Sequence, residues 1–326
     1  MTEANRQGSE STSLAEDLSP RELTWLKPPP LELIKRPIRR WLYSPYVWLA
    51  SPLFARRYGH YLPFPVDLWL GGQRGNDYEA HRRRLNKFVN LRNKQILVAG
   101  CGAGRDIASW LPYTPKLVVG IDYLNYARAW DRSVTYYRSR YPASKVEFVQ
   151  GDLQRLDLFE DGRFDVIGSD AVLEHVTNLP VVAREFVRLL RPGGIVYATF
   201  GPLWYTWQGD HYSGWDSLAS GFNHLVMDAK SYERYFELGD FDSHPELEEG
   251  RSWTRYKLFS HLRSTDYVET LSKAGLERQF IGVLIEPNAV RCLRKHESLR
   301  NVLLKNNTER DLLVGGMTVI YRKPLD

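Results

Sequence analysis

The sequence predicts an α/β protein built on a doubly wound, mainly parallel sheet. Between residues 94 and 200, short apolar runs of strand length alternate with segments of helical periodicity. This alternation is typical of a parallel sheet with helices on both faces. Glycines follow the first run at alternate positions (Gly100, Gly102, Gly104), and carboxylates follow later runs. Because such sheets bind ligands beyond the carboxyl ends of their strands, we expect these residues to share one site.

Length and composition are those of a globular protein. The chain has 326 residues, 43% of them hydrophobic, enough for a complete α/β core with additional elements. Two cysteines, Cys101 and Cys292, cannot form a disulfide framework and favour a reducing setting. The sequence contains no apolar run of membrane-spanning length and no signal-peptide pattern. We therefore expect a cytoplasmic protein.

The net charge of +5 is concentrated in one segment. Residues 27–94 contain fourteen Lys or Arg and four Asp or Glu, whereas residues 1–26 carry a net charge of −3 and the remainder −2. Such a segment attracts nucleic acid, an anionic membrane or a phosphorylated substrate, or it is an ordinary solvated face. These alternatives stay open at the level of sequence.

The N-terminal third divides into two predicted parts. Residues 1–26 are rich in Ser, Glu and Thr and are predicted to be a disordered tail. Residues 27–93 are predicted to be a basic, aromatic and helical extension that packs on the core. Its apolar middle, Trp41–Phe54, is interrupted by Pro45 and Pro52, so it is too short and too broken to span a bilayer. A peripheral contact with an anionic membrane is the alternative for this middle.

Residues 94–326 are predicted to form the main domain, with seven strands and the last one antiparallel. The apolar runs predict strands at 96–99, 117–121, 145–149, 164–168, 195–200, 278–285 and 314–322. Helical patterns occur at 78–89, from Asp106 onward, and at 126–140, 181–190 and 264–273. Insertions at 201–262 and 287–313 interrupt this plan. Since loops after strands build substrate sites, we expect the first, aromatic-rich insertion after strand five to set specificity.

The order of these motifs resembles the class I S-adenosylmethionine-dependent methyltransferases, of the bacterial type that acts on small molecules and glycans. The matching features are the Gly-x-Gly-x-Gly loop, the acidic end of strand two (Asp122), Gly-Asp-Leu after strand three (Asp152), the stretch from Phe164 to Val176, and Leu-Arg-Pro-Gly-Gly at 190–194. The resemblance implies a Rossmann-like sheet. Val98 departs from the pattern, because the family often has an acidic residue two positions before the first glycine.

The resemblance implies S-adenosylmethionine as the cofactor. The backbone of the glycine loop would surround the methionine moiety, Asp122 would accept the ribose hydroxyls, and Asp152 with Leu153 would meet the adenine edge. The implied cofactor-binding residues are Gly100, Cys101, Gly102, Gly104, Arg105, Asp122, Tyr123, Asp152, Leu153, Ser169 and Asp170. For each aspartate, the alternative is a turn or helix-cap role.

The insertion at 201–262 is predicted to be an aromatic lid that excludes water from a polar substrate. Its histidines include His211, His224 and His244, and their wide, irregular spacing does not match a zinc site, so no metal is expected. Methyl transfer to a hydroxyl is aided by a general base. His211 is the first candidate base with Asp210 as its orienting residue or a substrate ligand, and His175 is the second. The alternative for His211 is a hydrogen-bonded histidine inside the lid.

The predicted function is methyl transfer to a small or medium polar acceptor, through an oxygen of a sugar, glycolipid or secondary metabolite. An RNA-modifying enzyme is one alternative, motivated by the basic segment 27–94 and its aromatic residues. Nucleic acid is not the expected partner, because the sequence contains no recognisable RNA-binding module and Ser-Asp-Ala-Val stands at 169–172 in place of an Asn-Pro-Pro-Tyr-type tetrapeptide. A catalytically silent scaffold is the other alternative, against which the intact glycine loop argues.

Overall fold

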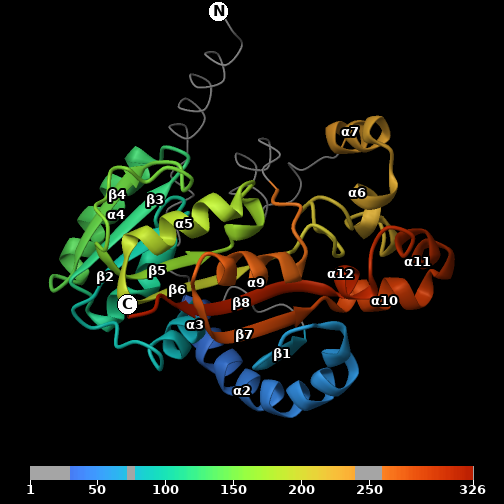
Figure 1. Cartoon of the computed structure of the whole chain (residues 1–326), viewed down its shortest axis with the longest axis horizontal. Helices are drawn as coiled ribbons and strands as arrows, with labels where there is room; N and C mark the ends of the chain where they lie inside the picture. Colours follow the sequence, from blue (N-terminus) through green and yellow to red (C-terminus); the bar gives the residue numbers. More distant parts are fainter. Residues whose placement is uncertain (1–29, 72–77, 239–258, 326) are drawn as a thin grey trace, which may run out of the picture.

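The computed structural model describes residues 30–71, 78–238 and 259–325. The predicted disordered tail at 1–26 lies outside the described residues, as does His244 of the lid. Figure 1 shows a central sheet with helices on both faces, confirming the predicted α/β class.

The sheet has eight strands in the order β1-β7-β8-β6-β5-β2-β3-β4. The strands are β1 (Leu68–Gly71), β2 (Gln95–Ala99), β3 (Leu117–Asp122), β4 (Lys145–Gln150), β5 (Phe164–Asp170), β6 (Leu190–Phe200), β7 (Glu277–Ile285) and β8 (Val314–Arg322). β8 runs antiparallel to both of its neighbours, β6 and β7, and the other pairs are parallel. All seven predicted strands are present, with the last one antiparallel.

The predicted count of seven strands is wrong by one. The additional strand, β1, comes from the N-terminal extension and pairs in parallel with β7, so that it covers an edge of the sheet that would otherwise be open. A strand of four residues is too short to display a periodicity of its own. Its formation therefore depends on the partner strand, which is more than 200 residues away in sequence.

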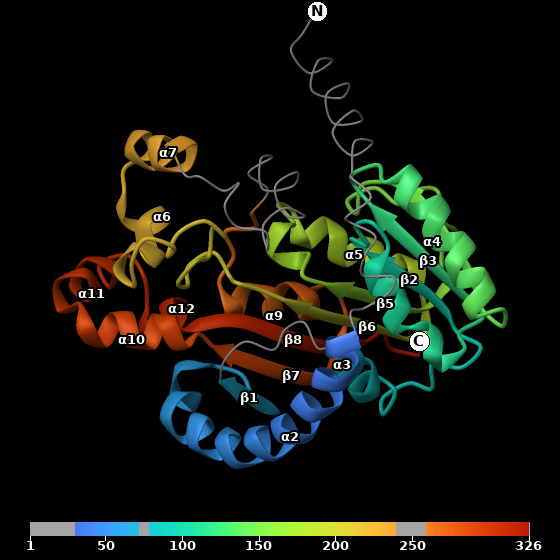
Figure 2. The same cartoon turned by 180° about the vertical axis from the view of Figure 1, so that it is seen from behind.

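The described helices are α2 (Pro30–Tyr58), α3 (Tyr78–Leu85), α4 (Ala127–Arg140), α5 (Leu179–Leu189), α6 (Asn223–Val226), α7 (Ala229–Leu238), α9 (Ser264–Lys273), α10 (Pro287–Lys295), α11 (Glu297–Leu303) and α12 (Glu309–Leu313). α5 and α9 cover one face of the sheet, and α3 and α4 cover the other (Figures 1 and 2). The two insertions form α6, α7 and α10–α12, which gather beyond one end of the sheet (Figure 1).

Burial on both faces explains why the central strands read as continuous apolar runs. In β2, Leu97 and Ala99 pack on the face of α5, while Ile96 and Val98 pack on the opposite face. All four side chains are essentially inaccessible to solvent. Val98, which stands where the family often has an acidic residue, is thus part of the hydrophobic core.

The helix expected from Asp106 onward is only a short 3₁₀ helix, Arg105–Ser109. Trp110 then turns into the core, where its ring lies against Gly168: a Cβ atom at that glycine would come within 2.2 Å of the indole. Pro112 follows inside the next 3₁₀ turn, and proline removes a backbone donor. Packing of the indole therefore replaces regular helix at this point.

α2 is one continuous helix of 29 residues that runs through Pro45 and Pro52, so the expected interruption at these prolines is wrong. It curves around β1 (Figures 1 and 2), with Val47 and Tyr58 buried on its inner side. The Ser51 hydroxyl on the same side donates a hydrogen bond to the Trp69 carbonyl of β1 at 2.8 Å. Across the described ranges, no helix is long and apolar enough to cross a membrane.

Candidate active site

Three glycines shape the loop after β2. All have positive φ angles, +73° at Gly100, +50° at Gly102 and +95° at Gly104. A Cβ atom at Gly100 would meet Val172 at 2.2 Å, and one at Gly104 would meet the Phe148 ring at 2.6 Å. At Gly102 no heavy atom lies within 4 Å of the Cβ position. The loop is therefore packed at both ends and open in its middle, where a ligand can approach the backbone.

Asp122, at the end of β3, holds this open middle in place. Its carboxylate accepts hydrogen bonds from the backbone N–H of Gly102 at 2.7 Å and of Leu124 at 3.0 Å. Burial raises the pKa of Asp122 to about 6, against the opposing effect of these N–H groups. From the other side, the Trp130 indole N–H donates to the Gly102 carbonyl at 2.8 Å.

The remaining predicted residues near the loop differ in exposure. Cys101 is buried, and burial raises the pKa of its thiol well above the usual range. Tyr123 and Arg105 are exposed. Asp152 lies just beyond β4, partly buried, and its carboxylate accepts a hydrogen bond from the Gln154 N–H at 2.9 Å in a local turn. Leu153, beside it, is also partly buried. Their contacts with a cofactor stay predictions.

Ser169 and Asp170, at the end of β5, are buried with partners from the protein itself. The Ser169 hydroxyl donates to the Ala99 carbonyl at 3.2 Å. Asp170 forms a buried ion pair with Arg82 of α3 and accepts a hydrogen bond from the Tyr197 hydroxyl at 2.9 Å. Their predicted role in cofactor binding is not tested by these contacts.

Sequence reasoning missed Arg82, which sits in a run of three arginines that looks like a solvated basic surface. Its guanidinium lies over the Trp110 ring, 3.7 Å from the centroid, and no part of its side chain is exposed. The signal that could have found it is Asp170, because a carboxylate at the end of a buried strand requires a partner.

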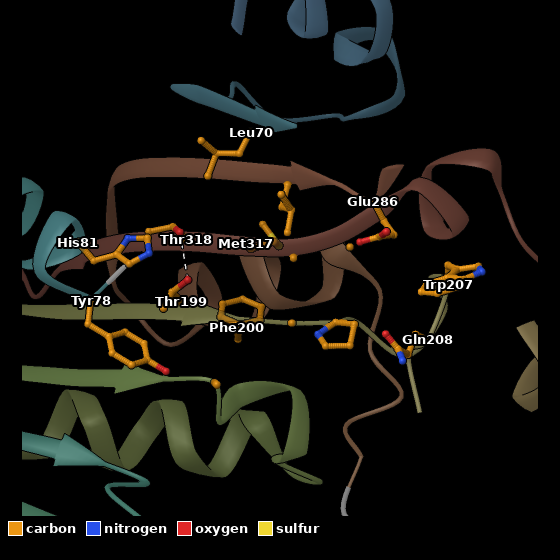
Figure 3. Close-up of a pocket in the computed structure, with 16 residues that line it drawn as sticks. Leu70, Tyr78, His81, Thr199, Phe200, Trp207, Gln208, Glu286, Met317 and Thr318 are labelled. Atoms are coloured by element: carbon orange, nitrogen blue, oxygen red, sulfur yellow. Dashed lines mark hydrogen bonds between the residues drawn. The ribbon is translucent and has the colours of Figure 1, made fainter. Parts of the chain in front are cut away.

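A cavity of about 390 Å³ lies beyond the carboxyl ends of β6 and β7, between α3 and the start of the first insertion (Figure 3). Tyr78 and His81 stand at one end of it, and Glu286 and Trp207 at the other. The residues that line it are Leu70, Tyr78, His81, Ala171, Thr199, Phe200, Gly201, Pro202, Trp207, Gln208, Leu284, Glu286, Gly315, Gly316, Met317 and Thr318. This volume and the mixture of aromatic and polar side chains suit a small organic ligand.

The two predicted histidines meet in the structure. The rings of His175 and His211 are 5.1 Å apart between centroids, and the Phe259 ring lies 5.5 Å and 5.9 Å from them. Burial, together with nearby His175 and His224, holds the pKa of His211 well below its usual range. The lowered pKa favours the neutral imidazole of His211 at neutral pH and makes it a weaker base than an exposed histidine.

Asp210 is fully buried inside the lid. Its carboxylate accepts hydrogen bonds from the Ser213 hydroxyl at 2.6 Å and the Tyr232 hydroxyl at 2.8 Å, and it lies 3.7 Å from Nδ1 of His224. These contacts join the start of the first insertion to its own helices, α6 and α7. Its predicted role in orienting His211 stays a prediction.

Glu174 is a buried acid that sequence reasoning did not single out. One carboxyl oxygen accepts a hydrogen bond from the Gly201 N–H at 3.0 Å, and the other has no hydrogen-bond partner within the described part of the chain. Burial raises the pKa of Glu174 to about 8. Glu174, the residue that precedes His175, therefore places beside the end of β6 a carboxyl group whose proton is favoured by burial at neutral pH.

The strand order, the glycine loop after β2 and the acid at the end of β3 define a class I methyltransferase domain. Residues 97–198 match the model of the methyltransferase domain family. Residues 97–198 of this chain thus form a methyltransferase domain of the class I S-adenosylmethionine-dependent type.

Relatives with assigned names share this domain. The chain is 33% identical over 133 residues to a phthiotriol/phenolphthiotriol dimycocerosates methyltransferase of Mycobacterium leprae, across 38% of this chain and 46% of the relative. It is 28% identical over 122 residues to a sterol 24-C-methyltransferase of Aspergillus fumigatus, across 37% of this chain and 30% of that relative. The match thus spans less than half the length of either relative. A solved structure of geranyl diphosphate methyltransferase in complex with SAM aligns with a TM-score of 0.47 at 13% identity, over 76% of this chain and 85% of that one.

Proposed function

We propose that this protein transfers a methyl group from S-adenosylmethionine to an oxygen of a small or medium polar acceptor, such as a sugar, a glycolipid or a secondary metabolite. The observation that carries the proposal is the position of two features at one edge of the sheet. The open glycine loop follows β2, and the 390 Å³ cavity lies beyond the parallel strand β6. Parallel strands bring their carboxyl ends, and so both features, to the same edge.

The residues of the loop fit the cofactor. The space beside Gly102 leaves room for a ligand against the backbone, and a side chain there would fill it. Asp122 already accepts two backbone hydrogen bonds, but a carboxylate has about four acceptor positions, so it can also accept from ribose hydroxyls. When bound, S-adenosylmethionine supplies an electrophilic methyl group on a sulfonium centre. Asp152 and Tyr123 would contact the nucleoside.

The proposed role of His211 is to take the proton of the acceptor hydroxyl, with His175 beside it as the second candidate. A neutral imidazole is needed for this step, and the lowered pKa of His211 supports that state. A positioned general base contributes about 10²- to 10⁴-fold to a rate. Phe259, packed against both histidines, would exclude water from them.

The relatives favour a lipid-linked acceptor among the classes proposed. One relative is a sterol methyltransferase and another a dimycocerosates methyltransferase, so both act on lipids by their names. A glycolipid combines such a lipid with the polar head group that the threonine hydroxyls and Glu286 of the cavity suit.

Calorimetric titration with S-adenosylmethionine and S-adenosylhomocysteine tests the cofactor site. We expect micromolar binding that Asp122→Ala abolishes and that Asp157→Ala, an exposed aspartate in a loop, leaves intact. The acceptor is then sought by transfer of a labelled methyl group to lipid, glycan, metabolite and RNA fractions. Label in a lipid, glycan or metabolite fraction supports the proposal. Label confined to RNA, or absence of cofactor binding in the wild type, contradicts it.

A further inference from the structure

The outward side of α2 carries an apolar stripe. We define this stripe as the outer face of α2; its members are Ile38, Trp41, Leu42, Trp48, Leu49 and Leu53. They are related by spacings of three, four or seven residues, so they project from one side of the helix. Trp41 and Trp48 are 75% and 76% exposed and Leu53 is 71% exposed.

This stripe is larger than the scattered apolar exposure of an ordinary surface. Seven of the thirteen exposed large hydrophobic residues in the described ranges lie on α2. The two indoles alone expose on the order of 300 to 400 Å², a contiguous area that marks an interaction surface in a soluble protein. The opposite side of the helix is already occupied, because Val47 and Tyr58 are buried and Ser51 bonds to β1. The outer face therefore has no structural role in the fold of the described residues.

The charge next to the stripe indicates what covers it. Arg56 and Arg57, in the last turn of α2, are exposed at the end of the stripe. α2 itself contains six Lys or Arg, and its only acidic residue is Glu32. This charge would oppose the approach of a second copy through the same face. Exposed tryptophan and leucine beside arginine are instead typical of a helix that lies in the interface of an anionic bilayer.

The dimensions agree with a helix that lies on a membrane. From Ile38 to Leu53 the stripe is about 22 Å long at 1.5 Å per residue. Interfacial helices bury their apolar face about 5–10 Å deep, a depth that indole and leucine side chains reach while the opposite face stays on the protein. Pro45 and Pro52 are exposed on this outer side, where the missing backbone donors face away from the packed side of the helix.

We propose that the outer face of α2 docks this protein on anionic lipid surfaces. The inference does not depend on methyl transfer. Docking through α2 would place the cavity close to the bilayer, because β1 packs on α2 and Leu70 of β1 lines the cavity.

Vesicle co-sedimentation of the full chain tests this docking, with phosphatidylcholine vesicles that contain or lack phosphatidylglycerol. We expect binding only to the anionic vesicles. Arg56→Gln/Arg57→Gln should weaken it by about fivefold per arginine, the usual contribution of a cation at such a surface. Trp41→Gln/Trp48→Gln should weaken it by about tenfold or more, because the indoles supply most of the inserted apolar area. Val302→Gln, which changes an exposed apolar residue on α11, is the matched control and should bind as the wild type does.

Three results would overturn the proposal. The first is a wild type that does not bind anionic vesicles, and the second is binding that the tryptophan variant retains in full. The third is a wild type that does not bind vesicles but associates with itself, where the tryptophan variant does not. That result would show that the outer face of α2 binds a second copy of the chain. Calorimetry with S-adenosylmethionine on the same samples checks that each variant is folded, since α2 lies at the far edge of the sheet from the glycine loop (Figure 1).

Discussion

Replacing Glu174 with glutamine is expected to change the pH dependence of stability. Burial raises the pKa of this carboxyl from 4.5 to about 8. Between these two values the unfolded chain has lost the proton and the native protein retains it. The free energy of unfolding of the wild type therefore falls as pH rises through this window, by about 1.4 kcal/mol per pH unit from this group. Above pH 8 the contribution levels off.

Glutamine has no proton to lose, and its carbonyl can still accept the hydrogen bond of the Gly201 N–H. Wild type and Glu174→Gln should thus have similar stability near pH 5, where both side chains are neutral. At pH 9 the variant should be more stable by about 4–5 kcal/mol, from the difference between a pKa of about 8 and 4.5. For a chain of this length, that difference corresponds to a rise in Tm of about 6 °C.

The assay is thermal or urea unfolding of both proteins at matched pH values from 5 to about 9. Other titrating groups are common to both proteins and cancel in the difference. Glu277→Gln, which removes a carboxylate from an exposed position on β7, is the matched control and should leave stability close to that of the wild type. A constant difference for Glu174→Gln, or a variant that loses stability relative to wild type as pH rises, would refute the reasoning.

Three further sets of substitutions, at His211, at Arg82 and in the glycine loop, test the site. His211→Gln should lower kcat by about 10²- to 10⁴-fold if His211 is the base. The wild-type kcat/KM should stay level down to below pH 6.5, because the pKa of His211 is lowered. Unchanged turnover of the variant would contradict the role of His211 as general base. Arg82→Met should lower the free energy of unfolding in urea by about 3–5 kcal/mol, because the buried Asp170 carboxylate loses its partner. Arg82→Met/Asp170→Asn should recover part of this stability, and equal losses of stability in the single and double variants would contradict the ion pair. Gly104→Ala should prevent stable folding, because its Cβ atom would clash with the Phe148 ring. Gly102→Ala has open space around the Cβ atom but a left-handed backbone, so it should fold with a loss of stability of about 1–2 kcal/mol and lose cofactor affinity in calorimetry. Equal stability of the two alanine variants would contradict the packing argument.

The sheet and the glycine loop after β2 could be predicted from the amino-acid sequence. β2 is buried on both faces, so its apolar character is continuous and visible without a structure. The glycine loop is equally local, because positive φ angles at three alternate positions favour glycine at each of them. β8 and α9 coincide with their predicted bounds for the same reason: their patterns are strong within a single segment.

Tertiary structure alone decided the features that join distant segments. A proline inside a helix costs about 3 kcal/mol, and α2 nevertheless continues through Pro45 and Pro52, where its inner side packs on β1. β1 itself exists only because β7 offers an edge. Arg82 looks solvated in sequence, but the fold buries it against Asp170. The proximity of His175 and His211 likewise arises because the first insertion returns to the segment that follows β5. Contacts between residues far apart in the chain leave no periodic trace in either segment.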